Sequence, residues 1–260
     1  MSEFRWVKLE SSDDGVRILI LDKPPVNALG RELVEDLARA FEVLREDMSV
    51  RCLVVRSAGK NFCAGADLKE RQGMSLEDVR RFVPMLAGVF RNLAGLPFPT
   101  ISAVRGAAAG GGCELALACD LRILTEDATI GLRETALAIL PGAGGTQRLP
   151  RMIGPSRAKR WIFTARMHTA QDALADGVAD LLVPSARLEE EAGDLAEAIA
   201  ANGPVAVRLA KRAIDRGMDS SIADGLALEW ECYQGTLETE DRVEALRAFA
   251  EKRRPRFHGR

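Results

Sequence analysis

The chain has 260 residues, of which 47% are hydrophobic and 28% are charged, and its mass is 28.2 kDa. This composition is typical of a globular protein with a large apolar core, and it excludes a disordered or collagen-like chain. The 36 basic and 38 acidic residues give a net charge of −2, so the sequence offers no basic surface for DNA or RNA. Only two histidines are present, His168 and His258, which excludes a metal site built from several histidines.

The cysteines and the N-terminal residues bear on the compartment. Five cysteines with no C-x-x-C pair cannot form a complete set of disulfides, so we expect small buried thiols in a reducing environment. The sequence has no run of 18 apolar residues, and residues 1–10 have neither the apolar segment of a secretory signal nor the composition of a transit peptide. We therefore expect a cytoplasmic protein with no membrane partner. The alternative is a mature form whose targeting segment has been removed.

Strand and helix patterns alternate along the first two hundred residues. A short apolar run at 16–21 predicts a strand that ends before Pro24 and Pro25, since proline cannot donate a hydrogen bond to a sheet. A second strand is predicted at 52–55. Between them, apolar residues recur at steps of three and four, which predicts one face of an amphipathic helix: Val34, Leu37, Phe41, Leu44 and Met48.

The same alternation continues toward residue 200. A helix is predicted to begin after Ser75, which can accept a hydrogen bond from the first turn and is followed by acidic residues in that turn. Further strands are predicted at 100–104 and 121–124. Strands that are separated by helices indicate an α/β fold.

The last quarter of the chain has a different pattern. From Gly203 onward no strand is predicted, and residues 226–254 form a long helical stretch. One helical face before that stretch consists of Val205, Leu209, Ala213 and Ile214. We expect an α/β core at 1–200 and a helical region at 201–260 that packs on the core or on a neighbouring subunit.

Three glycine-bearing segments are candidates for ligand binding: 62–68 (F-C-A-G-A-D-L), 110–115 (G-G-G-C-E-L) and 141–146 (P-G-A-G-G-T). Only the second follows a strand and leads directly into an apolar helix. Glycines there let the backbone approach a ligand, and the unpaired amides of the first helical turn favour an anion or a developing oxyanion. The first segment lies in a strand-to-helix loop and could supply a second amide. Any one segment alone would indicate a tight turn, but three in one chain, two of them beside carboxylates, favour a functional site.

Several common nucleotide and hydrolase motifs are absent from the sequence. Residues 107–115 and 141–146 do not match the G-x-G-x-x-G pattern of dinucleotide-binding proteins. Neither the phosphate-binding pattern G-x-x-x-x-G-K-[ST] nor the serine-hydrolase pattern G-x-S-x-G is present. The sequence therefore gives no support to a dehydrogenase, a nucleotide triphosphatase or a serine hydrolase.

Two carboxylates are candidates for acid–base chemistry. Glu114 lies in the first turn of the glycine-led helix, where the helix dipole favours an anion. Glu134 follows a strand-like segment at 129–131 and precedes an apolar run at 136–140. Each glutamate alone could be structural. The 20 residues between them, with a helix and a strand, permit the two carboxylates to meet but do not require it.

Three segments together resemble the signature regions of the enoyl-CoA hydratase/isomerase, or crotonase, family: 62–69 (F-C-A-G-A-D-L-K), 110–120 (G-G-G-C-E-L-A-L-A-C-D) and 131–149. The resemblance continues into 239–255, which is similar to the family's C-terminal helix, and so covers nearly the whole chain. It is closest to the short-chain enoyl-CoA hydratases and the methylglutaconyl-CoA hydratases. The resemblance implies an α/β fold of the crotonase type, a spiral of ββα units with a helical C-terminal region.

The resemblance also implies roles for individual residues. Ala66 and Gly111 match the two positions whose backbone N–H groups form an oxyanion hole for the thioester oxygen. Glu114 and Glu134 match the acid/base pair of the hydratases, and Gly142 matches a glycine that helps to position the water. The loop that lines the CoA site is matched by Ala64, Ala66, Asp67, Leu68 and Lys69.

The presence of both glutamates implies reversible hydration of a 2-enoyl-CoA thioester to a 3-hydroxyacyl-CoA through an enolate. An ionised Glu114 would take a proton from water while a protonated Glu134 delivers one to Cα, or both would act through one shared water. This chemistry needs no metal and no cofactor, since CoA is part of the substrate. The alternative is an enoyl-CoA isomerase, because the same enolate serves both reactions.

The resemblance extends to assembly and to a second alternative function. It implies a homotrimer or a dimer of trimers, in which Lys252 and Arg256 could bind CoA phosphates and Phe257 could pack on the adenine of a neighbour's CoA. An RNA-binding member of the family is the less favoured alternative, in which lysines of the first helix contact RNA. Residues 31–48 contain no lysine and six acidic residues against three arginines, so they would repel a phosphate backbone.

The sequence leaves two types of acyl group open for the substrate. A short-chain acyl group of fatty acid metabolism would need only an apolar pocket, for which the candidates are Met74, Phe82, Met85, Leu86 and Leu137. A methylglutaconyl group of branched-chain amino acid degradation carries a second carboxylate and would need a cation, for which the candidates are Arg71, Arg80, Arg81 and Arg133. A buried cation would distinguish the two, since an unpaired buried charge is costly without its acidic substrate.

Overall fold

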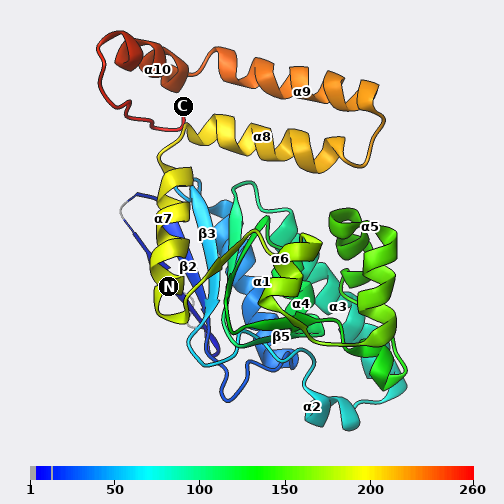
Figure 1. Ribbon diagram of the computed structural model, residues 1–260. Helices are drawn as coiled ribbons and strands as arrows, with labels where there is room; N and C mark the ends of the chain where they lie inside the picture. Colours follow the sequence, from blue (N-terminus) through cyan, green and yellow to red (C-terminus); the bar gives the residue numbers. More distant parts are fainter. Residues whose placement is uncertain (1–3, 13) are drawn as a thin grey trace.

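The computed structural model describes residues 4–12 and 14–260. Figure 1 shows an α/β body that contains the strands and a layer of three helices that extends across one end of it. These three helices are α8 (Pro204–Gly217), α9 (Ile222–Leu237) and α10 (Glu240–Ala250). Within the described residues, no helix is long and apolar enough to cross a membrane.

A six-stranded sheet forms the centre of the body. Its strands lie in the order β1 (Val7–Ser11), β2 (Val16–Leu21), β3 (Cys52–Ser57), β4 (Thr100–Val104), β6 (Leu121–Thr125) and β9 (Leu181–Val183). β1 is antiparallel to β2, and every other neighbouring pair is parallel. The four strands predicted from the sequence are thereby confirmed, and β1 and β9 extend the sheet at its two edges.

Helices cover both faces of this sheet, which a largely parallel sheet requires. β3 shows the alternation: Val54 belongs to the apolar cluster under α7 (Leu188–Ala200), whereas Leu53 and Val55 point into the larger core on the other side. That larger core contains the buried residues of α1 (Arg31–Glu46) and α3 (Leu76–Ala94). The sheet and these two helices form the rigid support on which the loops described below are held.

The two predicted helices of the body have the expected apolar faces, and the prediction is wrong at one residue. In α1 the residues Leu37, Phe41 and Leu44 are buried, but Met48 lies beyond the helix and is 72% exposed. The helix ends at Glu46, before Met48 can join the face. At the start of α3, Ser75 accepts a hydrogen bond from the backbone of Asp78 while the Asp78 carboxylate returns to Ser75, which confirms the predicted cap.

A second, three-stranded sheet lies beside the first. It pairs β5 (Ala107–Ala109) in parallel with β7 (Thr129–Gly131), and β7 antiparallel with β8 (His168–Thr169). His168 pairs with Ile130 in this sheet, and its ring stacks on that of Trp161 at 3.9 Å. The remaining helical segments are α2 (Leu68–Gln72), α4 (Gly111–Leu117), the 3₁₀ turn η1 (Glu134–Leu137), α5 (Gly145–Thr164, broken at Gly154), α6 (Ala170–Asp176) and the 3₁₀ turn η2 (Ser185–Arg187).

The C-terminal helices differ from the sequence expectation at one point. The stretch expected to be one long helix at 226–254 is two helices, because a new helix begins after Thr239, whose hydroxyl accepts a hydrogen bond from the backbone of Arg242. α8 and α9 run antiparallel and pack on each other, as Figure 1 shows. This region exposes many large apolar side chains: Ile214, Met218, Ile222, Leu226, Trp230, Tyr233, Val243, Leu246 and Phe249.

All five cysteines are buried free thiols, as the sequence predicts. Burial raises the pKa of the thiols of Cys52, Cys63 and Cys119 to about 12. It raises the pKa of Cys113 well above its ordinary value, and the nearby charges of Glu114 and Glu134 add to that shift. These thiols therefore act as small apolar packing groups.

Candidate active site

The three glycine-bearing segments meet around one cavity of about 350 Å³. Its walls come from the loop after β3, from α2, α3 and α4, and from the residues between β7 and α5. The lining residues are Ala66, Arg71, Val79, Val83, Leu86, Gly111, Glu114, Glu134, Ile139, Leu140, Gly142 and Ala143. The cavity is mostly apolar, and its few polar groups converge on it from different segments, which is typical of a ligand-binding site.

The loop after β3 brings the backbone of Ala66 to the cavity. Leu29 pairs with this loop: its N–H donates to the oxygen of Gly65 at 2.8 Å, and its oxygen accepts from the N–H of Asp67 at 3.2 Å. Because Leu29 bonds to the residues on either side, the N–H of Ala66 points away from Leu29. Gly65 has a φ of +85°, and a Cβ there would lie 2.5 Å from the oxygen of Ala109, so only glycine permits this close approach.

The N-terminus of α4 brings Gly111 to the same place. Gly110 precedes the helix with a φ of +53°, so Gly111 is the first helical residue, and its N–H has no partner earlier in the helix. A Cβ on Gly111 would lie 3.9 Å from the nitrogen of Ala66 and 2.9 Å from Leu29 Cδ1. The backbones of Ala66 and Gly111 therefore approach each other at the cavity wall, where two N–H groups could bind one oxygen atom.

Glu114 lies one turn into α4 and is only 2% exposed. Its Oε1 accepts hydrogen bonds from the N–H groups of Ala143 and Gly145, both at 2.8 Å. The pKa of Glu114 is raised, because burial outweighs the lowering by the two amide bonds and by the Arg148 guanidinium. The 141–146 segment thus orients this carboxylate and favours its ionised form.

Arg148 supports this arrangement from behind, and the sequence analysis did not identify it. Its Nη1 donates to the oxygen of Ala143 at 2.9 Å, and its Nη2 donates to the oxygen of Phe90 at 3.3 Å. The guanidinium ties the segment that binds Glu114 to α3. Its position three residues after Gly145 in α5 was visible in the sequence, but nothing in the local pattern indicated which way it points.

Glu134 enters the cavity from the other side, as the first residue of η1. The N–H of Gly110 donates to the oxygen of Gly131 at 2.8 Å, and a Cβ on Gly110 would lie 2.9 Å from Glu134 Oε1. Its Oε2 is buried and has no hydrogen-bond partner among the described residues. Burial raises the pKa of Glu134 to about 7, and the charge of Glu114 adds to the shift. The two glutamates therefore lie in one cavity with unlike environments.

The apolar walls differ from the set expected from the sequence. Of that set only Leu86 lines the cavity; Phe82 and Met74 pack in or against the core, and Met85 and Leu137 are exposed. The lining residues that the sequence analysis missed are Val79, Val83, Ile139 and Leu140. Val79, Val83 and Leu86 are spaced by four and three residues, so the helical period could have identified this face of α3. Gly142 faces it, since a Cβ there would lie 2.8 Å from Val83 Cγ1.

Of the four arginines considered for the pocket, Arg71 lines the cavity. Arg80, Arg81 and Arg133 are exposed and do not line it. Burial lowers the pKa of Arg71, and the charge of Glu70 opposes the shift. One cation therefore lies in a wall otherwise made of aliphatic side chains, glycines and the two glutamates.

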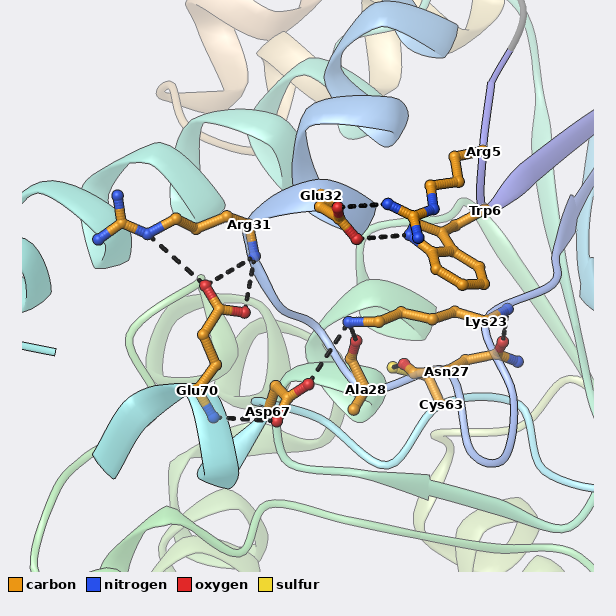
Figure 2. Close-up of polar contacts among 10 residues, drawn as sticks. All are labelled: Arg5, Trp6, Lys23, Asn27, Ala28, Arg31, Glu32, Cys63, Asp67 and Glu70. Atoms are coloured by element: carbon orange, nitrogen blue, oxygen red, sulfur yellow. Dashed lines mark hydrogen bonds and ion pairs between the residues drawn. The ribbon is translucent and has the colours of Figure 1, made fainter. Parts of the chain in front are cut away.

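The residues assigned to CoA binding fall into two separate places. Ala64, Leu68 and Lys69 are exposed, on the loop that carries Ala66 and on α2, and they do not line the cavity. Asp67 caps α2 by accepting from the N–H of Glu70 at 3.2 Å and pairs with Lys23 Nζ at 3.4 Å, as Figure 2 shows. These contacts hold the loop in place.

The C-terminal residues do not line the cavity of their own chain. Lys252, Arg256 and Phe257 follow α10, and the oxygen of Phe257 accepts a hydrogen bond from Arg51 Nη2 at 2.6 Å. Figure 1 places the end of the chain beside α8 and α2 at the opposite end of the molecule. Any contact of these three residues with CoA therefore requires the site of another subunit.

Comparison with known proteins gives consistent matches over the whole chain. A family model described as enoyl-CoA hydratase/isomerase matches residues 11–260. The enoyl-CoA hydratase domain-containing protein 2, mitochondrial, of Homo sapiens is 46% identical over 269 residues, covering 100% of this chain and 91% of that protein. The methylglutaconyl-CoA hydratase, mitochondrial, of Mus musculus is 45% identical over 263 residues, covering 99% of this chain and 84% of that protein.

Comparison with solved structures gives matches to the same family. The crystal structure of an enoyl-CoA hydratase from Bacillus anthracis matches with a TM-score of 0.96 and 45% identity, and the match covers 98% of this chain and 100% of that one. A second, from Mycobacterium smegmatis, matches with a TM-score of 0.92 and 30% identity over 98% of this chain and 99% of that one. The match includes the helical C-terminal region as well as the α/β body.

Proposed function

This chain belongs to the enoyl-CoA hydratase/isomerase family, and from that premise we propose that it adds water reversibly to a 2-enoyl-CoA thioester to give a 3-hydroxyacyl-CoA. The observation that carries the proposal is a pair of glutamates in one cavity, with Glu114 buried and Glu134 half-buried, beside two backbone N–H groups. Hydration needs one group to activate water, one to supply a proton and a site for the charge that develops on the thioester oxygen. The cavity offers a candidate for each.

The N–H groups of Ala66 and Gly111 would bind the thioester oxygen. As water adds to Cβ, electrons move onto this oxygen to form an enolate, which two preorganised donors stabilise. The loss of one such donor typically raises the barrier by about 3 kcal/mol. Both donors belong to backbone that is fixed by Gly65 and by the start of α4, so they need little reorganisation during the reaction.

The two glutamates would divide the proton transfers. Ionised Glu114 takes a proton from water, whose oxygen forms the bond to Cβ, and protonated Glu134 gives its proton to Cα as the enolate collapses. The amide bonds to Glu114 Oε1 support the ionised role, and the raised pKa of Glu134 supports the protonated one. In the reverse direction each group has the opposite role. CoA is part of the substrate, and the steps use no other cofactor.

The isomerase alternative would use the same oxyanion site but would need one group to move a proton along the acyl chain. The presence of a second carboxylate that is positioned by two amides favours hydration, since activation of water needs a base of its own. The two reactions are distinguished by their products, because hydration removes the enoyl chromophore and isomerisation of a 3-enoyl thioester creates it.

The proposal includes assembly into trimers, or into dimers of trimers. Its support is the row of large apolar residues exposed on the C-terminal helices, since monomeric soluble proteins rarely expose large continuous apolar patches. In such an assembly the tail that carries Lys252 and Phe257 would reach CoA in a neighbour's site. Ala64, Asp67, Leu68 and Lys69 would contact CoA from the chain that owns the cavity.

The loss of enoyl-thioester absorbance tests the reaction, with crotonyl-CoA and 3-methylglutaconyl-CoA as parallel substrates. We expect rapid turnover of at least one, with formation of a 3-hydroxyacyl-CoA confirmed by mass. No loss of absorbance with either, together with formation of a 2-enoyl product from a 3-enoyl-CoA, would replace hydration with isomerisation.

A further inference from the structure

Arg71 has an unusual position in the cavity wall. Its Nη1 is buried and has no hydrogen-bond partner among the described residues, and none of their carboxylates forms an ion pair with its guanidinium. Phe82 packs against it, with the guanidinium carbon 5.2 Å from the centre of the ring. A guanidinium stays charged in proteins, so this nitrogen carries a hydrogen-bond donor and a positive charge that the chain itself leaves unsatisfied.

The catalytic carboxylates do not supply the missing partner. Glu114 is satisfied by the N–H groups of Ala143 and Gly145, and the guanidinium that acts on it is that of Arg148. None of the groups that shift the pKa of Glu134 is Arg71. Arg71 and the glutamates thus line one cavity without neutralising one another. Arg71 as a whole is half-buried, but its Nη1 is buried without a partner, and an anion bound there would supply the hydrogen bond that this nitrogen lacks.

Contacts on the other side of α2 fix the position of Arg71. The carboxylate of Glu70 accepts hydrogen bonds from the N–H of Arg31, at 3.1 and 3.3 Å, and its Oε1 lies 3.6 Å from Arg31 Nε. Figure 2 shows Glu70 turned toward the first residue of α1, with Asp67 and Lys23 beside it. Glu70 is thus engaged by Arg31, and it anchors the short helix from which Arg71 extends into the cavity.

We propose that Arg71 binds a free carboxylate on the acyl group of the substrate, so that the preferred substrate is a 2-enoyl-CoA with an acidic acyl chain. This inference rests on the proposed function for the reaction, but the carboxylate site itself does not depend on it. The aliphatic residues Val79, Val83 and Leu86 would enclose the carbon chain, and the guanidinium would bind the carboxylate by paired N–H···O bonds. A neutral short-chain substrate would leave the cation unpaired.

Binding of unreactive ligands tests the site directly. Glutaryl-CoA and valeryl-CoA have acyl chains of equal length that differ in a terminal carboxylate, and neither has a double bond to hydrate. For Arg71→Met we expect calorimetry to show glutaryl-CoA binding weakened about 10- to 100-fold, as for the loss of a charge-assisted hydrogen bond, with valeryl-CoA binding unchanged or improved. Arg71→Lys should retain part of the preference, because it keeps the charge but loses the planar fork.

Arg80→Met is the matched control, since it removes the same charge from an exposed position on α3. It should change the affinities for both ligands equally and slightly. If Arg71→Met and Arg80→Met have the same effect on glutaryl-CoA, or if wild-type protein does not prefer glutaryl-CoA to valeryl-CoA, the carboxylate site is wrong. An effect of Arg71→Met on both ligands alike would instead assign Arg71 to CoA phosphates and would also overturn the proposal.

Turnover separates this inference from the proposed reaction. Crotonyl-CoA and glutaconyl-CoA are both 2-enoyl thioesters, and only the second carries an acidic acyl group. We expect wild-type kcat/KM to favour glutaconyl-CoA and Arg71→Met to lose about 10- to 100-fold on that substrate alone. Hydration of both substrates at equal rates would leave the reaction standing and the inference wrong. Selective glutaryl-CoA binding without hydration of either would leave the carboxylate site standing and the reaction wrong.

Discussion

The α/β body and the C-terminal helices differ in how far their large apolar residues are buried. In the body, Phe41, Phe90 and Trp161 are completely buried. On the C-terminal helices, Trp230 is 57% exposed and Phe249 is 86% exposed. The buried residues of these three helices, all of which the structure describes, are only Pro204, Cys232, Asp241 and Ala248.

If the protein assembles as proposed, this difference separates what one chain completes by itself from what a neighbouring subunit would cover. The body has its own core, covers both faces of its sheet and contains the whole of the cavity. The C-terminal helices are stabilised by each other and present an apolar surface to the outside. Chemistry and assembly should therefore respond to mutations in different parts of the chain.

The largest effect should come from the two glutamates of the body. Glu114→Gln and Glu134→Gln should each lower kcat by about 10²- to 10⁴-fold, because each removes one proton-transfer group. The affinity for butyryl-CoA, measured by calorimetry, should change little. Glu42→Gln, an exposed carboxylate on α1, is the control and should leave kcat unchanged. Near-normal rates in both the Glu114 and the Glu134 variant would contradict the paired mechanism.

The next effect concerns the core alone. Trp161→Ala should lower the free energy of unfolding by about 3–5 kcal/mol, because it leaves a cavity, removes the stacking on His168 and breaks the bond from Nε1 to Asp176. Phe163→Ala lies on the same helix at a position that is 72% exposed, and it should cost about 0.5 kcal/mol or less. Urea titration of the two variants at one protein concentration measures both values, and equal losses would show that Phe163 is buried in an interface.

Substitutions on the C-terminal helices should act on assembly. Trp230→Ser and Phe249→Ser should each weaken association by about 2 kcal/mol, since each removes a large apolar side chain from the exposed surface. Analytical ultracentrifugation should then show smaller species with unchanged helix content by circular dichroism. Val43→Ser, an exposed apolar residue on α1, is the control for apolar loss elsewhere. A wild-type protein that sediments as a monomer would exclude this interpretation of the surface.

The smallest expected effect is on the pH dependence of kcat, for which we compare one carboxyl group from the body with one from the C-terminal helices. Glu134 has a pKa raised to about 7, whereas ion pairs with Arg253 and Arg247 hold the pKa of Glu244 on α10 well below its usual range. Because hydration needs protonated Glu134, kcat should fall about tenfold for each pH unit above about 7. Glu244→Gln should leave this profile unchanged. Infrared titration of Glu114→Gln should give a lower pKa for Glu134, because the neighbouring negative charge has been removed.

The main elements of the body could be predicted because each has a local signature. The four central strands are short apolar runs, and Ser75 with Asp78 marks the start of α3. β1 could not be predicted in this way, because it is an edge strand with largely exposed residues. The break before Thr239 had a local signal, a threonine that can cap a helix, but the helical pattern on both sides concealed it.

For the candidate site, the sequence indicates which residues could line a cavity, but it does not indicate which way their side chains point. The glycines and glutamates depend on backbone position and on burial, which sequence segments indicate. Which of four arginines lines the cavity depends on how α2 is anchored by Glu70, some 39 residues from its partner Arg31. The walls formed by Ile139 and Leu140 depend on a turn between β7 and α5 that has no periodic pattern. Such long-range contacts have no local signature.

The buried thiol of Cys113 has a consequence for a protein proposed to bind thioesters. A thiolate beside Glu114 could attack the carbonyl carbon of a bound thioester and displace the CoA thiol. The acyl group would then stay attached to the protein. Complete burial and the two neighbouring carboxylates keep this sulfur protonated, and a protonated thiol is a poor nucleophile. With a thioester bound as proposed, Cys113 would not take up the acyl group, and the acyl group would leave the cavity on the same carrier that brought it.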